Sequence, residues 1–229
     1  IIEIGPGREA LTEEIIKKKP KSLSLIEKDF FLAENLKKKY SDCNNIKVYN
    51  SDVLKFDIEK ITTKNTIIFG NLPYNISSQI LVKFLKFKKW PPKFNDLIFM
   101  FQKELGKKII GVYPSSDYGR IAILSNFRLN VLNKFYVSPN CFFPKPKVTS
   151  MVIHFRTKKK NSFTIKNISN LEKVTNILFS NKRKMINKNI KKILTENKIK
   201  DIQDLKLNLR PSDINPEVYY KITELYEKK

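Results

Sequence analysis

The chain has 229 residues, 41% of them hydrophobic, which is enough for a buried core. Its formal net charge of +23 favours a polyanionic partner, of which nucleic acid is the first candidate. No apolar run approaches the roughly 18–20 residues of a membrane span, which excludes a helical membrane protein. The chain has two cysteines, Cys43 and Cys141, and one histidine, His154. These residues are too few for a zinc site or a histidine-dependent triad, so we predict no metal. The low number of cysteines indicates a reduced, cytoplasmic protein.

The chain begins with the pattern of a strand, a glycine turn and a helix. Residues 1–4 form the end of an apolar strand, Gly5 and Gly7 follow at once, and apolar residues at helical spacing continue to position 19. Glycines at such a turn let the backbone approach a ligand closely. The full Gly-x-Gly-x-x-Gly pattern is absent, which argues against a dinucleotide and for a smaller adenosine ligand.

Acidic residues follow the next two predicted strands. Residues 22–26 form a strand that ends in Glu27, about 20 residues after the glycines, where a carboxylate is placed to bind ribose hydroxyls. Residues 46–49 form a third strand, and Asp52 behind it can accept a hydrogen bond from an adenine amino group. Each acid alone also fits a solvated loop residue, but their recurrence after successive strands favours one shared site.

The most informative motif is Asn71-Leu72-Pro73-Tyr74, which follows the apolar run 66–70. The carboxyl end of a buried strand is where an open α/β sheet places its ligands. The Asn71 side chain and the backbone carbonyl of Leu72 or Pro73 can accept hydrogen bonds from an amino group on a flat ring. Pro73 stiffens the loop, and Tyr74 offers a stacking face. The alternative is a strand-end turn in which the asparagine caps and the tyrosine packs.

The remaining segments continue the alternation and then become helical. In chain order we predict a helix over 76–85, a strand over 96–101, helices over 104–110 and 119–125, a hairpin of 127–137 and 148–155, and helices over 171–178, 185–194 and 218–225. Alternating βα units indicate an α/β fold with a mostly parallel, doubly wound sheet. A linker over 156–162 divides the chain into predicted domains 1–156 and 163–229.

The positive charge gathers in the last third of the chain. The basic clusters are Lys158-Lys159-Lys160, Lys182-Arg183-Lys184, Lys188, Lys191 and Lys192. Part of the lysine excess also reflects the composition that a low-GC genome imposes. The clusters are suited to RNA phosphates and would make binding sensitive to salt, positioning the protein without reading bases.

These motifs resemble the S-adenosylmethionine-dependent rRNA adenine N6-dimethyltransferases. The matching segments, which extend over nearly the whole chain, are 2–7, 26–29, 51–54, 71–78, 102–104, 118–124 and 137–150. Leu72 and the basic carboxyl-terminal region are most similar to the small-subunit (kasugamycin-resistance) branch of that family. Glu9 departs from the family, which usually has glycine or alanine there; its carboxylate would pair with the ammonium of the cofactor or point to solvent. Family members carry a further segment ahead of residue 1, which we expect to be missing here.

The resemblance implies the fold and the site. The fold is that of a class I S-adenosylmethionine-dependent methyltransferase, Rossmann-like with a seven-stranded, mostly parallel sheet, followed by a small C-terminal all-helical domain that binds RNA or the ribosome. The cofactor, S-adenosyl-L-methionine, is expected at Gly5, Gly7, Glu27, Lys28, Asp52, Val53 and Asn71. Catalysis is expected at Asn71, Leu72, Pro73, Tyr74 and Phe142, with Phe142 and Tyr74 stacking on a flipped adenine. For Phe143 we favour a role as an anchor in the core.

The activity implied is dimethylation of N6 on two adjacent adenines near the 3′ end of small-subunit (16S) rRNA, within a pre-30S particle and by a monomeric cytoplasmic enzyme. Three alternatives stay open. They are an erythromycin-resistance-type enzyme acting on large-subunit rRNA, a non-catalytic assembly or transcription factor of the same fold, and a DNA adenine methyltransferase.

Overall fold

The computed structural model describes residues 1–228, which form a seven-stranded sheet and nine α-helices. The strands are β1 (Ile2–Ile4), β2 (Leu23–Glu27), β3 (Ile46–Asn50), β4 (Thr66–Asn71), β5 (Phe94–Gln102), β6 (Leu129–Val137) and β7 (Ser150–Thr157). The helices are α1 (Thr12–Lys17), α2 (Phe30–Lys39), α3 (Ser77–Leu85), α4 (Lys103–Ile109), α5 (Arg120–Arg128), α6 (Ile168–Leu178), α7 (Asn187–Ile190), α8 (Glu196–Lys200) and α9 (Pro216–Glu227).

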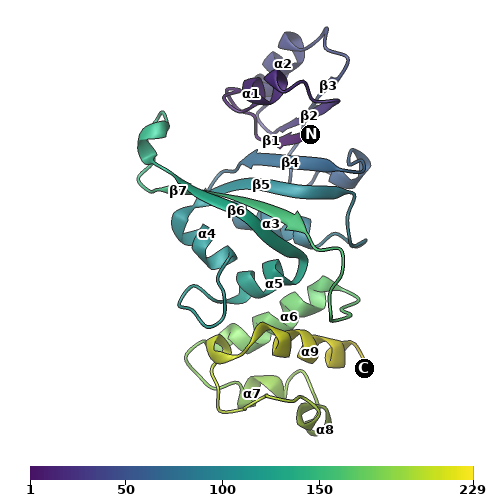
Figure 1. Ribbon diagram of the computed structural model, residues 1–229, viewed down its shortest axis with the longest axis vertical. Helices are drawn as coiled ribbons and strands as arrows, with labels where there is room; N and C mark the ends of the chain where they lie inside the picture. The colour runs from purple at the N-terminus through teal and green to yellow at the C-terminus, as the bar shows by residue number, and fades with distance from the viewer. Residues whose placement is uncertain (229) are drawn as a thin grey trace. The chain divides into compact units, whose positions relative to one another are not determined.

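The sheet has the strand order β3-β2-β1-β4-β5-β7-β6 (Figure 1). Strands β1 to β5 run parallel to one another, and β7 pairs antiparallel with β5. The order reverses direction at β1 and β4, which makes the sheet doubly wound. The predicted seven-stranded, mostly parallel sheet with a closing antiparallel hairpin is therefore confirmed.

The central strands are apolar along their length because helices cover a parallel sheet on both faces. The buried side chains of the strands include Ile2, Ile4, Leu23, Leu25, Ile26, Ile68, Leu97, Phe99 and Ile153. Beside β2, α1 and α2 contribute Ile15 and Leu36 to a common cluster with Leu23 and Leu25. This packing holds the carboxyl ends of β1, β2 and β4 rigidly.

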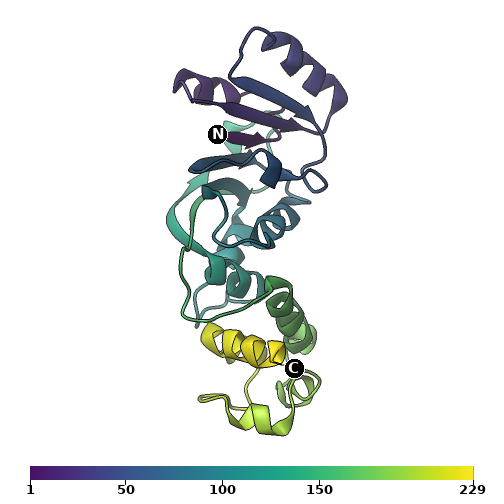
Figure 2. The ribbon, with the colours of Figure 1, turned by 90° about the vertical axis from the view of Figure 1, so that its right-hand side faces the viewer.

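The chain forms two compact units. The first contains residues 1–84, 91–106 and 130–157, and the second contains 85–90, 107–129 and 158–229. Within the second unit α9 lies along α6, as both views show (Figures 1 and 2). Tyr219 of α9 is fully buried, stacks on Phe179 and donates a hydrogen bond to the Pro211 carbonyl. Tyr220 donates to the Ile123 carbonyl of α5, which joins α5 to this helical unit.

Two local predictions differ from the structure. Helix α5 extends to Arg128, so the hairpin strand begins at Leu129 and not at Phe127. The apolar stripe over 185–194 is a four-residue helix, α7, flanked by turns, although Ile186, Ile190, Ile193 and Leu194 are buried as predicted. No helix among residues 1–228 is long and apolar enough to cross a membrane.

Candidate cofactor and catalytic site

Strand register brings the predicted site residues to one edge of the sheet. Ile4 of β1 pairs with Ile26 of β2 and with Gly70 of β4. The residues one step further along these three strands, Gly5, Glu27 and Asn71, therefore lie at the same edge. Asn50 of β3 pairs with Glu27, which places Asp52 just beyond that edge as well. All four belong to the first compact unit.

The glycine turn needs glycine for its backbone conformation. Gly5 and Gly7 have φ values of +66° and +54°, in the left-handed region that side chains disfavour. The Gly5 N–H donates to the Ile26 carbonyl at 2.9 Å. A Cβ added at Gly5 would meet no atom within 4 Å, so the turn borders open space in which a ligand can lie against the backbone.

The Glu27 carboxylate is fixed by two backbone donors. Oε2 accepts from the Gly7 N–H at 3.1 Å, and Oε1 accepts from the Asp29 N–H at 2.9 Å. The residue is 7% exposed. A carboxylate has about four acceptor positions, so two remain for the hydroxyl groups of a ligand, and the bonds from the Gly7 and Asp29 N–H groups hold the carboxylate in place.

Asp52 is an ionised acceptor held by its own loop. Its Oδ2 lies 2.9 Å from Lys28 Nζ, and its Oδ1 accepts from the Leu54 N–H at 2.9 Å. The hydrogen bond from Lys28, supported by the Leu54 N–H, lowers the pKa of Asp52. The adjacent Val53 side chain is buried and anchors the backbone. Lys28 therefore contacts Asp52, and sequence reasoning had assigned both to the cofactor.

The Asn71–Tyr74 loop leaves its asparagine accessible while its neighbour is anchored. Asn71 ends β4 with an exposed side chain, whereas Leu72 is 2% exposed. Leu72 fills the space beside Gly70, where an added Cβ would lie 2.5 Å from Leu72 Cδ2. The Pro73 carbonyl accepts from the Ile76 N–H at 3.1 Å. Of the two backbone acceptors predicted, the Leu72 carbonyl is therefore the better candidate.

Tyr74 ties this loop to the antiparallel hairpin. Its hydroxyl lies 2.6 Å from Ser150 Oγ, the first residue of β7, and its carbonyl accepts from Ser77 Oγ at 3.1 Å. Sequence reasoning missed Ser150 as a site residue, and its only signal was its place at the end of the matching segment 137–150. The contact orients Tyr74 and joins it to the first residue of β7, the strand that follows the segment carrying Phe142.

Phe142 and Phe143 have different surroundings. Phe142 follows the short turn Pro139–Cys141, its N–H donates to the Pro139 carbonyl at 3.2 Å, and it is half-buried. Phe143 is 95% exposed. The prediction that Phe143 anchors the loop in the core is wrong, because the extended proline-rich segment carries this side chain outward.

The Glu9 side chain packs against the end of α2 and does not point freely to solvent. Its Oε2 accepts from the Tyr40 hydroxyl at 2.5 Å and lies 2.9 Å from Lys39 Nζ, so the carboxylate binds the end of α2. Its φ of +69° lies in the left-handed region, which explains why glycine is favoured at this place. The side-chain contacts compensate for the backbone strain.

Replacing Glu9 separates these two effects. Glu9→Ala removes both contacts and keeps the unfavourable φ, so we expect the free energy of unfolding to fall by about 1–2 kcal/mol. Glu9→Gly removes the contacts but relieves the strain, so about 1 kcal/mol should be regained. Urea unfolding of the wild type and both variants measures this, and equal losses in the two variants would contradict the strain argument.

A second buried acid, Glu3, was not recognised from the sequence. It lies inside β1, is 2% exposed, and its Oε2 accepts from the Thr12 hydroxyl at 2.7 Å. Burial raises the pKa of Glu3 to about 7, the Thr12 hydrogen bond opposes this in part, and the nearby carboxylates of Glu9 and Glu27 add to the rise. This hydrogen bond joins β1 to α1, the elements on either side of the glycine turn, so Glu3 helps to fix the conformation of the turn.

The pKa of Glu3 predicts a pH dependence of stability. Between its ordinary pKa of 4.5 and its folded value of about 7, the folded chain keeps a proton that the unfolded chain has released. Stability therefore falls as pH rises through this window. Glu3→Gln should abolish the fall, a change of up to roughly 3 kcal/mol relative to wild type between pH 4.5 and 8. Urea unfolding at both pH values measures this difference in stability, and Glu104→Gln at an exposed position is the control. Parallel curves of stability against pH for Glu3→Gln and wild type would refute the prediction.

The single histidine has a structural environment. His154 Nε2 lies 2.9 Å from Oδ1 of the buried Asp96, which also accepts from Arg156 Nε at 3.0 Å. This group joins β5 to β7. Among residues 1–228 no three or more His, Cys, Asp or Glu side chains are grouped as metal ligands would be.

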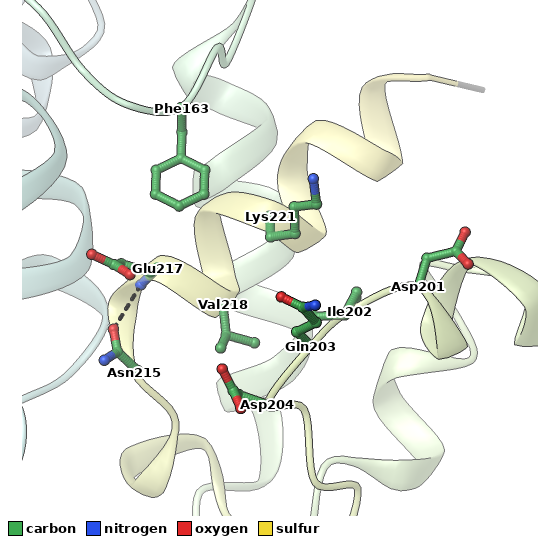
Figure 3. A pocket seen from close by; sticks show the side chains of 9 residues that line it. All are labelled: Phe163, Asp201, Ile202, Gln203, Asp204, Asn215, Glu217, Val218 and Lys221. Carbon is green, nitrogen blue, oxygen red and sulfur yellow. Dashed lines mark hydrogen bonds between the residues drawn. The ribbon is translucent and has the colours of Figure 1, made fainter.

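Among the described residues of the second compact unit, one hollow is mainly acidic and another is basic. One, of about 600 Å³, is lined by Phe163, Asp201, Ile202, Gln203, Asp204, Asn215, Glu217, Val218 and Lys221. Figure 3 shows Glu217 and Asp204 near Val218, with Asp201 farther away. Three carboxylates against the one ammonium of Lys221 in this lining disfavour phosphate. The other, of about 450 Å³, is lined by Met185, Asn187, Lys188, Lys191, Leu207 and Asn208. Its lysines belong to the predicted basic clusters.

Comparisons with known proteins show similar chains over nearly the full length of the sequence. The family described as "Ribosomal RNA adenine dimethylase" matches residues 1–228. A "Ribosomal RNA small subunit methyltransferase A" of Pelagibacter ubique is 42% identical over 99% of this chain and 86% of that protein, and one of Malacoplasma penetrans is 37% identical over 97% and 79%.

Solved structures share the fold. A dimethyladenosine transferase from Plasmodium falciparum superposes with a TM-score of 0.76 at 23% identity, covering 99% of this chain and 89% of that one. A 23S rRNA methyltransferase, ErmE, superposes with a TM-score of 0.70 at 21% identity, covering 99% and 90%. At these identities the likeness concerns the architecture alone.

Proposed function

The chain belongs to the ribosomal RNA adenine dimethylase family, and from this membership we propose that it dimethylates N6 of two adjacent adenines near the 3′ end of small-subunit rRNA, with S-adenosyl-L-methionine as methyl donor. Relatives at 42% and 37% identity carry small-subunit names. The observation that carries the proposal is the register that gathers Gly5, Glu27 and Asn71 at one edge of the sheet.

The residues at this edge fit S-adenosylmethionine. Gly5 and Gly7 offer backbone beside open space, and Glu27 keeps acceptor positions free for ribose hydroxyls. Asp52 supplies an ionised acceptor for the adenine amino group of the cofactor, with Lys28 and Val53 holding its loop. When bound, the cofactor supplies an electrophilic methyl group without a metal. Each assignment is a proposal that can be tested by measuring the cofactor affinity of a variant with that single residue replaced.

The Asn71–Tyr74 loop would prepare the target amino group. The Asn71 side-chain oxygen and the Leu72 carbonyl would each accept a hydrogen bond from one N–H of this group and draw the two hydrogens out of the ring plane, which localises the lone pair on N6. Tyr74, oriented by Ser150, and Phe142 would hold the flipped base by stacking. The contribution of these residues is then to orient the amino group toward the methyl donor, and such alignment can lower the activation barrier by roughly 7–11 kcal/mol.

The second part of the proposal concerns the RNA. We assign residues 163–229 to binding RNA or the ribosome through the exposed basic side chains of 182–184 and of Lys188, Lys191 and Lys192. Residues 1–156 would carry catalysis. The particle would be a pre-30S subunit, and the enzyme a cytoplasmic monomer. Binding through phosphates predicts an affinity that falls steeply with salt.

Methyl transfer to isolated particles tests the proposal. Tritiated S-adenosylmethionine is incubated with the protein and small subunits that lack the modification, or with naked large-subunit rRNA, and the digested nucleosides are identified. N6,N6-dimethyladenosine confined to small-subunit RNA is the expected result. Label in large-subunit RNA alone would transfer the assignment to the erythromycin-resistance type. Absence of transfer despite cofactor and particle binding would make the protein an assembly factor.

A further inference from the structure

The connection between β6 and β7 exposes aromatic side chains. It projects from the sheet as the teal-green loop in Figure 1. Phe135 and Tyr136 near the end of β6 are each 56% exposed, and Phe143 in the connection is 95% exposed. Exposed rings of this size on one projecting segment mark an interaction surface.

The charge on the same segment is of one sign. From Leu129 to Ser150 the chain contains no Asp or Glu, and its three lysines, Lys134, Lys145 and Lys147, are all exposed. Lys103 of α4 adds a fourth ammonium, 5.3 Å from the centre of the Tyr136 ring. Rings interleaved with lysines and without carboxylates match a polyanion that carries flat bases, which is an unpaired nucleic acid strand.

The base of the connection is fixed beside the catalytic loop. The Lys103 N–H donates to the Thr149 carbonyl at 2.9 Å, and the next residue, Ser150, contacts Tyr74. Pro144 and Pro146 stiffen the stretch between these anchors and Phe143. A strand that delivers one base to Tyr74 would therefore continue along this segment.

We propose that Phe143, together with Tyr136 and Lys145, forms a stacking surface for the unpaired RNA nucleotide that neighbours the target adenine. This inference rests on the proposed function, because it takes the substrate of the Asn71–Tyr74 site to be RNA. Phe143 acts as a positioning residue: it holds the flanking nucleotide and does not touch the reacting atoms.

The test measures RNA binding and methyl transfer separately. The probe is a fluorescent single-stranded RNA with two adjacent adenines, titrated by anisotropy without cofactor. Phe143→Ala should weaken binding at least about fivefold, the effect of losing one base stack, and Phe143→Trp should restore it. Phe31→Ala, which removes a ring that is 77% exposed on α2, is the matched control and should bind as wild type.

Fluorescence and kinetics supply independent readouts. In Phe143→Trp the added indole should be quenched when RNA binds, beyond any change in the wild type, whose single tryptophan is Trp90. In methyl transfer, Phe143→Ala should raise KM for small subunits and leave kcat at saturation unchanged. A merely structural role would lower kcat or the thermal midpoint instead.

The outcomes separate this inference from the proposed function. If Phe143→Ala binds RNA within twofold of wild type while the wild type still dimethylates small-subunit RNA, the stacking surface is refuted and the function stands. If the wild type transfers no methyl group to RNA yet Phe143→Ala loses RNA binding, the surface stands and the function fails. A change in sedimentation without a change in RNA affinity would assign the surface to a second copy of the chain and overturn the inference.

Discussion

Asn71→Ala is expected to lower the rate of methyl transfer by at least about a hundredfold, the scale of losing one preorganised hydrogen-bonding group at a reacting centre. Asn71 ends β4 with an exposed side chain, one residue beyond the paired Gly70 and Ile4. Alanine fits this backbone without strain, so the fold should persist. Cofactor affinity should weaken but stay measurable, because Glu27 and Asp52 are unchanged.

The matched control for this variant is Asn75→Ala. Asn75 is an exposed asparagine of the same loop, and its replacement should leave the rate within a few-fold of wild type. Single-turnover transfer measures the chemical step, and calorimetric titration measures cofactor affinity. Full activity in Asn71→Ala would remove the proposed mechanism, whereas equal losses in both variants would mean that the loop is generally fragile.

Arg128→Met is expected to have the largest effect on stability. Arg128 is 4% exposed, donates to the carbonyls of Leu85 and Phe87, and lies 4.4 Å from the centre of the Trp90 ring. Burial lowers the pKa of Arg128 to about 10, so it stays charged at neutral pH. Methionine keeps the apolar stem but leaves both carbonyls without this donor, at a cost of about 3 kcal/mol.

Thermal unfolding of the full chain measures this loss. For a chain of this size 3 kcal/mol corresponds to a fall in Tm of roughly 6–12 °C. Arg183→Met, at an exposed position, should change stability by less than about 0.5 kcal/mol. The Tm of Arg128→Lys should lie between those of wild type and Arg128→Met, because lysine keeps the charge but not the planar guanidinium group. A Tm for Arg128→Met equal to that of wild type would show that the buried guanidinium is dispensable.

The parts of the site on parallel strands could be predicted from the sequence. Parallel strands end at the same edge of a sheet, so Gly5, Glu27 and Asn71 had to converge once their strands were recognised. Asp52 followed by the same rule. The apolar runs and the helical spacing between them were sufficient, because parallel βα units leave little choice of topology.

The features that depend on side-chain contacts between distant segments could not be predicted. Ser150 meets Tyr74 across 76 positions, and no local pattern marks that pair. Glu3 looked like one polar residue in a strand, and only its burial against Thr12 shows its role. Arg128 was placed in a strand because its anchors, Leu85 and Phe87, lie in another segment. Phe143 was assigned to the core on hydrophobicity alone.

The position of β7 between β5 and β6 has a consequence for the newly synthesised chain. Strand β6 precedes β7 in the sequence but is separated from β5 by it in the sheet. A nascent chain that ends after β6 therefore exposes an open β5 edge, and Tyr74 lacks the hydroxyl of Ser150 that orients it. The candidate catalytic loop is completed only when Ser150–Thr157 has been synthesised and has inserted between β5 and β6, so the contact that orients Tyr74 cannot form in a chain that ends before β7.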